Sequence, residues 1–126
     1  MVEWSFDPLN LKNAYFNVEK LGAVVRAFKP NLYGFTSSAL QAGLPTDRCI
    51  AEWNLMGSRK SRAPVKHVVV PADIDSIKQM NPQKARAIQQ DVAVQLQQHL
   101  NAGLAITAFE RTADSGIYLL SPWPSK

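Results

Sequence analysis

The chain has 126 residues, of which 46% are hydrophobic and 19% are charged, and its formal net charge is +4. This balance is typical of a single folded domain and argues against an intrinsically disordered chain. The sequence contains no apolar run long enough to cross a membrane, and it lacks the basic-then-apolar start of a secretory signal.

A strand and a helix joined by a sharp turn are the first predicted elements. Apolar and polar side chains alternate from Val2 to Phe6, which predicts a short strand with one buried face. Asp7-Pro8 ends this strand, because proline lacks an amide hydrogen and disfavours helix at the residue before it. Apolar residues then recur at helical spacing as far as Gly22, a residue suited to closing a helix. These apolar positions are Leu11, Ala14, Tyr15, Val18 and Leu21.

Two more strands are predicted on either side of a long connector. Residues 23–28 form the first, residues 31–47 form the connector, and residues 48–56 form the second strand, which a polar loop follows. The alternation of the second strand puts Cys49 on its buried side, so we expect a packed thiol. Because this lone cysteine cannot form an internal disulfide, we also expect a protein of the reducing cytoplasm.

The remaining sequence predicts a strand over residues 65–70, a short helix over residues 73–80 and one long helix. The long helix runs from Pro82 to Ala102, with Asn81 as its cap and Gly103 just past its end. Its predicted buried stripe consists of Ala85, Ile88, Val92, Leu96 and Leu100.

A terminal hairpin is predicted from two runs, Leu104 to Arg111 and Ile117 to Leu120, around the turn residues Asp114-Ser115-Gly116. No internal repeat is visible in the residues. The elements predict one α+β domain over residues 1–126, with five or six mostly antiparallel strands in a mixed sheet and a long helix in the C-terminal half.

Residues 13–22 contain a motif that points to a family. Their sequence, Asn-Ala-Tyr-Phe-Asn-Val-Glu-Lys-Leu-Gly, is in register with Asn-Ala-x-x-x-Tyr-x-Lys-Leu-Gly at Asn13, Ala14, Lys20, Leu21 and Gly22. The stretch resembles the fifth strand and fourth helix of the GNAT superfamily of acyl-CoA-dependent N-acyltransferases.

A second stretch, residues 43–53, looks like a bacterial branch of predicted GNAT proteins. The strand–helix unit belongs to the second half of the family's fold. The resemblance therefore implies a partial GNAT-like fold, corresponding to the C-terminal portion of such an N-acetyltransferase.

The resemblance also implies a cofactor and a set of contacts. The cofactor is acetyl-CoA, and Asn13 corresponds to the asparagine beside its pantetheine arm, with Phe16 and Asn17 on neighbouring helix positions. The family's tyrosine proton donor corresponds to Val18, which cannot donate, and Tyr15 lies one turn earlier. The family's glycine-rich pyrophosphate loop has no counterpart among the six widely spaced glycines. The resemblance thus implies a chain that is not a competent enzyme alone, and no catalytic residue is assigned.

The alternative function is a non-catalytic binding or oligomerisation module. The strand Val2 to Phe6 would be an exposed sheet edge, which predicts a homo-oligomer or a partner chain paired along it. The basic residues Arg59, Lys60 and Arg62 have no interleaved aromatic side chains, so we expect a solvated loop and no nucleic-acid partner.

Candidate metal and acid–base residues are sparse in the sequence. His67 and His99 lack metal-ligand spacing with other residues, so we expect both at the surface and no metal site. Glu52 is expected on the solvent-facing side of its strand, with a buried base as the alternative interpretation. Asp47, which precedes Arg48, is expected to hold a turn or a charge pair.

Overall fold

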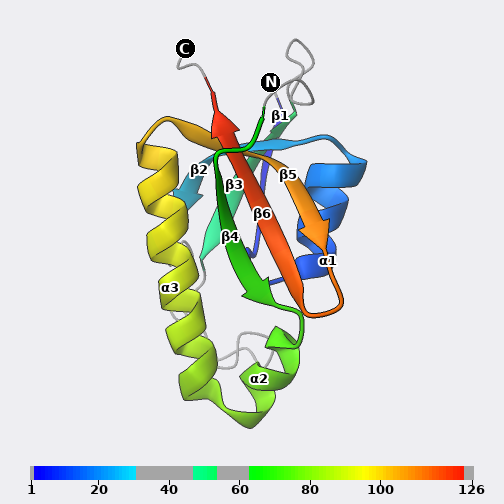
Figure 1. Ribbon diagram of the computed structural model, residues 1–126, viewed down its shortest axis with the longest axis vertical. Helices are drawn as coiled ribbons and strands as arrows, with labels where there is room; N and C mark the ends of the chain where they lie inside the picture. Colours follow the sequence, from blue (N-terminus) through cyan, green and yellow to red (C-terminus); the bar gives the residue numbers. More distant parts are fainter. Residues whose placement is uncertain (1, 31–46, 54–62, 124–126) are drawn as a thin grey trace.

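The computed structural model describes residues 2–30, 47–53 and 63–123 (Figure 1). In chain order the elements are β1 (Val2–Phe6), α1 (Leu11–Tyr15), the π-helical turn η1 (Phe16–Lys20), β2 (Val24–Lys29), β3 (Arg48–Trp53), β4 (Lys66–Pro71), α2 (Ile74–Met80), α3 (Pro82–Asn101), β5 (Leu104–Arg111) and β6 (Ser115–Pro122). The predicted α+β class and the predicted order of elements are confirmed. The connector and the polar loop lie outside the described residues except at their final positions.

The strands form one six-stranded sheet in the order β1-β3-β2-β5-β6-β4. Every pair of neighbouring described strands is antiparallel, so the expected parallel component of a mixed sheet is absent from them. The strands β1 and β4 lie at the two edges. The prediction that residues 2–6 form an edge strand is therefore confirmed.

The sheet consists of two halves with the same topology. In each half a strand, a helical segment and two further strands follow one another, and the first strand pairs with the third, which pairs with the second. The second strands of the two halves, β2 and β5, meet at the centre of the sheet. This repeat is one of topology, which explains why the residues themselves do not reveal it.

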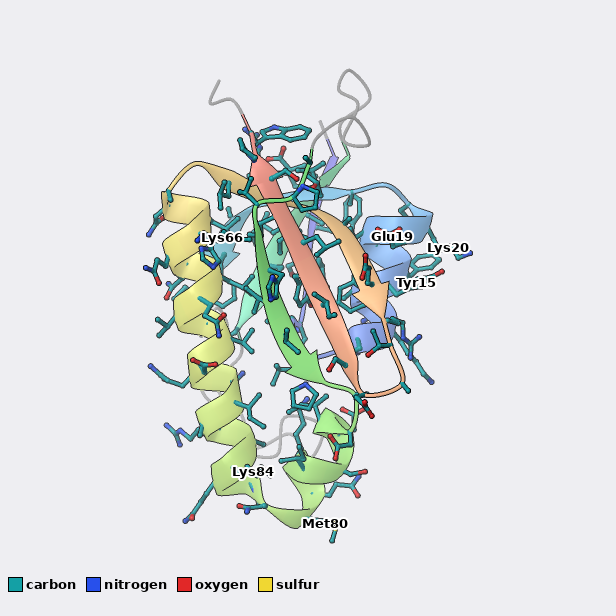
Figure 2. The ribbon with its side chains drawn as sticks, viewed as in Figure 1. Tyr15, Glu19, Lys20, Lys66, Met80 and Lys84 are labelled. Carbon is teal, nitrogen blue, oxygen red and sulfur yellow. The ribbon has the colours of Figure 1, made fainter. Side chains whose placement is uncertain are left out.

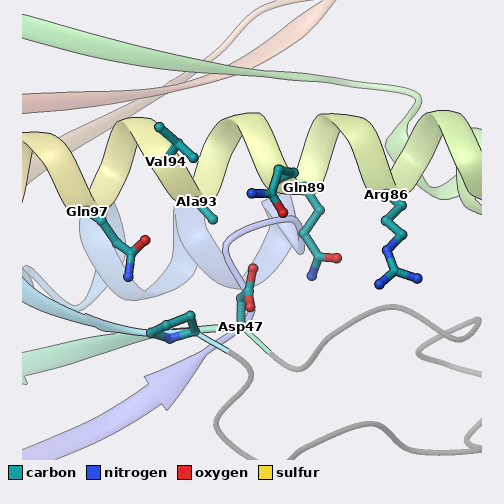
Figure 3. Close-up of a pocket in the computed structure, with 8 residues that line it drawn as sticks. Asp47, Arg86, Gln89, Ala93, Val94 and Gln97 are labelled. Carbon is teal, nitrogen blue, oxygen red and sulfur yellow. The ribbon is translucent and has the colours of Figure 1, made fainter.

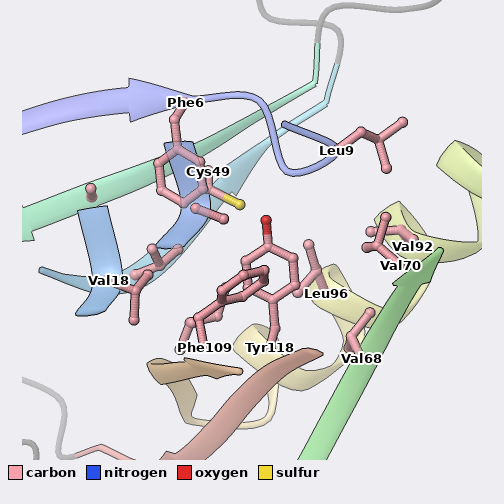
Figure 4. Packing of buried hydrophobic residues seen from close by; sticks show 14 of the residues in the cluster. Phe6, Leu9, Val18, Cys49, Val68, Val70, Val92, Leu96, Phe109 and Tyr118 are labelled. Carbon is pink, nitrogen blue, oxygen red and sulfur yellow. The ribbon is translucent and has the colours of Figure 1, made fainter. Parts of the chain in front are cut away.

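One hydrophobic cluster joins the helices to the sheet (Figure 4). It includes Ala14 from α1, Ile74 from α2 and Leu96 from α3, together with buried side chains of all six strands. The helices therefore cover the same face of the sheet. Helix α3 contacts β2 of the other half, and α1 and η1 contact β5, so each half packs onto strands of the other.

The first helix changes its hydrogen bonding halfway along. Asn10 Oδ1 accepts from the amide of Asn13 at 3.2 Å and caps α1, as expected of an asparagine at a helix start. From Phe16 onward the pattern is π-helical, and the amide of Leu21 donates to Phe16 O at 2.9 Å. The wider turn shifts the stripe, so Leu21 is exposed and its predicted burial is wrong. Gly22 has φ +73° and closes the helix as predicted.

The long helix α3 begins and ends as predicted. Asn81 Oδ1 accepts from the amide of Lys84 at 3.1 Å, Pro82 is the first helical residue, and Gly103 has φ +92°. Because L side chains rarely adopt that φ, glycine stands where the chain must turn back into β5.

The two halves of the sheet meet along a short seam. Val25 and Ile106 form the single register pair between β2 and β5, and both strands bulge next to this pair. Beyond it, the amide of Phe109 donates to Glu19 Oε2 at 2.8 Å. A carboxylate of η1 thus satisfies a strand amide of the opposite half.

We expect Glu19→Ala to weaken this junction, because the Phe109 amide then loses a charged acceptor. The predicted loss is about 1.5–3 kcal/mol in the free energy of unfolding, together with faster hydrogen exchange at the Phe109 amide. Glu19→Gln keeps an acceptor oxygen and should lose less. Urea unfolding and amide exchange measure both effects, and the exposed Glu110→Ala is the matched control. An unchanged exchange rate at Phe109 in Glu19→Ala would contradict this account.

Candidate functional site

The three predicted cofactor residues lie on α1 and η1. Asn13 is exposed, and Phe16 is 54% exposed. Asn17 is buried and its side chain is bonded at both ends. Its Oδ1 accepts from Trp4 Nε1 at 2.6 Å, and its Nδ2 donates to Asn13 O at 2.7 Å. Asn17 therefore ties the helix to β1, whereas Asn13 and Phe16 are accessible from solvent. Their cofactor role stays a prediction.

Tyr15 lies on the same helix, and two cations lie near its ring. Lys20 Nζ is 5.7 Å and Arg111 Cζ is 5.9 Å from the centre of its ring. Figure 2 shows Tyr15, Glu19 and Lys20 close together on α1 and η1. The ring packs half-buried with its charged neighbours, a cation–π arrangement that stabilises this end of the helix.

Cys49 and Tyr118 are fully buried in the core (Figure 4). Tyr118 Oη donates to Pro8 O at 2.6 Å. Burial raises the pKa of the Cys49 thiol, and the negative charges of Asp7 and Asp47 raise it further. Burial also raises the pKa of Tyr118. The structure buries Cys49 completely, so the expectation of a packed thiol is confirmed.

Glu52 is 7% exposed, so the expectation that it lies on a solvent-facing strand surface is wrong. Arg26 donates to both of its carboxylate oxygens, at 2.9 Å from Nε and 2.8 Å from Nη2. The physical reason is the position of β3 between β1 and β2, which lets an arginine at the β2 bulge reach across to its neighbour. The two hydrogen bonds from Arg26 compensate the buried negative charge of Glu52.

A pocket of about 200 Å³ lies between α3 and the adjoining ends of β2 and β3 (Figure 3). Asp47, which is 6% exposed, extends its carboxylate toward α3, and Gln89 of α3 is 4% exposed. Among the described residues the walls are formed by Pro30, Asp47, Arg86, Gln89, Gln90, Ala93, Val94 and Gln97.

Sequence reasoning missed Gln89 as a site residue. Its position continues the spacing of Ala85, Val92 and Leu96, so it lies on the buried stripe of α3. A polar side chain at such a position costs free energy unless it is bonded, and this is the signal that the sequence offered. Asp47 was interpreted only as a turn or charge-pair residue.

A second pocket, of about 290 Å³, lies where α1 and α2 begin. Its described walls include the cations Lys12 and Arg111, the carboxylate of Asp75 and the polar residues Asn10 and Ser115. It is therefore polar and adjoins the helix that carries Asn13.

The part of the chain that the structure describes was searched for metal-ligand clusters and for membrane-spanning helices. It contains no group of three or more His, Cys, Asp or Glu that could hold a metal ion. His67 is exposed on β4, as the sequence predicted, whereas His99 on α3 is half-buried and not fully at the surface. None of the described helices is long and apolar enough to span a membrane. Arg59, Lys60 and Arg62 lie outside the described residues.

Comparison with known proteins yields no relative. No protein-family model, no curated protein and no solved structure matches this chain.

We expect the ion pair of Arg26 and Glu52 to be strongly coupled. Arg26→Ala leaves a buried carboxylate without its cation, and the predicted loss is about 3 kcal/mol in the free energy of unfolding. A double-mutant cycle with Glu52→Ala in urea measures the coupling. The control cycle uses Asp75 and Lys78, whose contact is 3.9 Å long and involves an exposed carboxylate, so its coupling should be below about 0.5 kcal/mol. Equal coupling in the two cycles would contradict the prediction.

We also expect stability to fall at alkaline pH. The native pKa values of Cys49 and Tyr118 lie above the ordinary values of 9.0 and 10.0, so the unfolded chain releases these protons while the native chain retains them. The stability that these groups contribute is fully present below pH 9.0 and is lost as the pH rises further.

The measurement is urea unfolding of the protein at a series of pH values from neutral upward. Cys49→Ala removes one of the two ionising groups, so its stability should decline less steeply with pH than that of the unmodified chain. Parallel pH profiles for the two proteins would show that the thiol is not held protonated.

Proposed function

We propose that this chain is a non-catalytic association module that pairs with a second copy of itself through β1. The observation that carries the proposal is the position of β1 at the sheet edge, paired with β3 on one side only. An edge strand offers a row of backbone donors and acceptors that another strand can bond.

The two sheet edges differ in how they are protected. The edge strand β4 contains Lys66 and Pro71, residues that discourage further strand pairing. By contrast, β1 has neither lysine nor proline, and its register with β3 runs without a bulge. This difference favours β1 as the edge that associates.

The charges on β1 favour one register for the pairing. Two antiparallel copies centred on Trp4 place Trp4 opposite Trp4, and each Glu3 opposite Ser5 of the partner copy. A register centred on Glu3 would instead oppose two carboxylates, and one centred on Ser5 would oppose Glu3 and Asp7. The Trp4-centred pairing is self-complementary and closes as a twofold dimer.

The residues that could carry catalysis support a non-catalytic role. The thiol of Cys49 and the phenol of Tyr118 are buried and protonated, and Glu52 is paired with Arg26. None of these three groups is available to activate a substrate.

The register can be tested by changing the charge at Ser5. In the Trp4-centred dimer, Ser5→Asp places two pairs of carboxylates opposite each other, and Ser5→Lys creates two ion pairs with Glu3. We expect the dimer dissociation constant to rise about fivefold in the first variant and to fall by a similar factor in the second. Sedimentation equilibrium at micromolar concentration measures both constants.

The matched control is Ser76→Asp, on the exposed surface of α2, which should leave the dissociation constant unchanged. Equal effects of aspartate and lysine at position 5 would rule out this register. An unmodified chain that stays monomeric throughout the micromolar range would overturn the proposal itself.

A second candidate function is acyl-CoA binding, as the GNAT resemblance implies for the C-terminal portion of an N-acetyltransferase. The observation that favours it is the polar pocket at the start of α1, whose described walls include Lys12 and Arg111. These two cations suit phosphate groups. The residues match the family's cofactor site only in part. Asn17 is bonded to Trp4, and the sequence has no glycine-rich pyrophosphate loop.

Calorimetry with acetyl-CoA tests this second candidate. Micromolar binding that weakens in Lys12→Ala would support a cofactor site at α1. Absence of heat at millimolar acetyl-CoA would exclude it and leave the association module. The cytoplasmic location inferred from the single cysteine stays a prediction.

A further inference from the structure

The polar pocket where α1 and α2 begin contains two cations that no carboxylate neutralises. It has a volume of about 290 Å³, and Lys12 of α1 and Arg111 of β5 are among its walls. Within residues 2–30, 47–53 and 63–123, neither cation forms an ion pair with a carboxylate. A pocket with two such cations is suited to an anionic ligand.

We propose that this pocket binds the phosphate group of a small organic phosphate, a phosphomonoester on a short apolar body. Lys12 and Arg111 would hold the phosphate oxygens, and Asn10 and Ser115 would donate further hydrogen bonds. The inference goes beyond the proposed association, because it concerns a different surface. It is also independent of the GNAT resemblance, because it rests only on the groups that line the pocket.

The sheet determines the side on which Arg111 lies. Arg111 ends β5 and pairs directly with Gly116 of β6. Because the side chains of directly opposed residues lie on the same face of a sheet, Arg111 lies on the face toward which a Cβ at Gly116 would point. A Cβ there would meet Leu11 Cδ2 at 2.9 Å, so this is the face that α1 covers. Arg111 Cζ accordingly lies 5.9 Å from the ring centre of Tyr15 on the same helix.

The close packing of α1 against the hairpin brings Lys12 to the same pocket. Gly116 has no side chain, which leaves room for Leu11 against the hairpin. Lys12 follows Leu11, in the first turn of the helix that the Asn10 side chain caps. The two cations therefore come from elements far apart in the sequence, and the backbone fixes the position of each.

The pocket also contains neutral donors. Asn10 Oδ1 accepts from the amide of Asn13, which leaves the Nδ2 hydrogens of Asn10 to donate. The amide and the carbonyl of Ser115 are bonded to Thr112, and the Ser115 hydroxyl remains as a donor. A phosphate group offers three acceptor oxygens where a carboxylate offers two, so this set of donors suits a phosphate better.

One carboxylate in the lining opposes an anion. Asp75 lines the pocket, and its side chain is 88% exposed, so solvent screens its charge. Its Oδ1 also lies 3.9 Å from Lys78 Nζ, and this cation offsets part of the charge. Lys12 and Arg111 are exposed as well, so we expect a modest affinity that falls as salt is added.

The size and the remaining walls set limits on the ligand. Pockets that hold drug-sized molecules have volumes of about 300–1,000 Å³, and this pocket lies just below that range. Leu9, Leu11, Ala72 and Ile74 provide its apolar walls. These features select a short aliphatic body.

The experiment compares three probes that carry the same butyl group, on the full chain in a phosphate-free buffer: n-butyl phosphate, pentanoate and n-butylammonium. ¹H–¹⁵N correlation spectra follow the Arg111 Nε–H group and the amides of Lys12 and Ser115. We expect saturable shifts with n-butyl phosphate, whose dissociation constant should be about fivefold lower than that of pentanoate. Pentanoate binding as tightly as n-butyl phosphate, or saturable binding of n-butylammonium, would overturn the proposal.

Two variants each remove one cation from the pocket. Lys12→Gln and Arg111→Gln should each raise the dissociation constant of n-butyl phosphate about fivefold. The matched control is Lys20→Gln, which removes a cation 5.7 Å from the Tyr15 ring that does not line the pocket, and it should leave the constant unchanged. Equal weakening in all three variants would show a general attraction to a basic surface and would overturn the proposal.

A titration with acetyl-CoA separates this inference from the second candidate function. Heat from acetyl-CoA without any response to n-butyl phosphate would favour acyl-CoA binding and overturn the small-phosphate proposal. Saturable binding of n-butyl phosphate without heat from acetyl-CoA would support the small-phosphate proposal and exclude acyl-CoA binding.

Discussion

The seam between β2 and β5 is the constraint on which the rest of this structure depends. The two halves of the sheet share one register pair, Val25 with Ile106, and bulges on both strands prevent the ladder from extending. Backbone pairing alone is therefore a weak junction, and the halves are held by other means. Glu19 reaches from η1 to the Phe109 amide, and the helices of each half pack across the seam onto strands of the other.

The junction between the two halves explains both the π-helical turn and the position of the Tyr118 hydroxyl. The π-helical turn widens the first helix just where Glu19 must face β5, and such turns commonly occur where a side chain has a special task. The burial of Tyr118, with its hydroxyl on Pro8 O, joins β6 of the second half to the turn after β1 in the first. Side-chain bonds that cross between the halves thus compensate for the short seam and define one cooperative core.

The same architecture decides which surfaces are available for function. With the helices on one face, the edge strand β1 keeps backbone groups that another strand can bond. Strand β1 lacks the lysine and proline that protect β4, and the α3 flank carries the buried Asp47.

The residues by themselves determined the local structure. The alternation of apolar and polar residues predicted β1. Asn81 and Gly103 marked the two ends of α3, and Gly22 marked the end of the first helix. Caps, turns and periodicity can be predicted in this way because they are short-range effects. Only the tertiary structure decided which strands became neighbours, and hence that Glu52 would be buried against Arg26 and that Gln89 would face Asp47 across a pocket. Burial of a charge depends on groups far away in the chain, and no local pattern records which of them will approach.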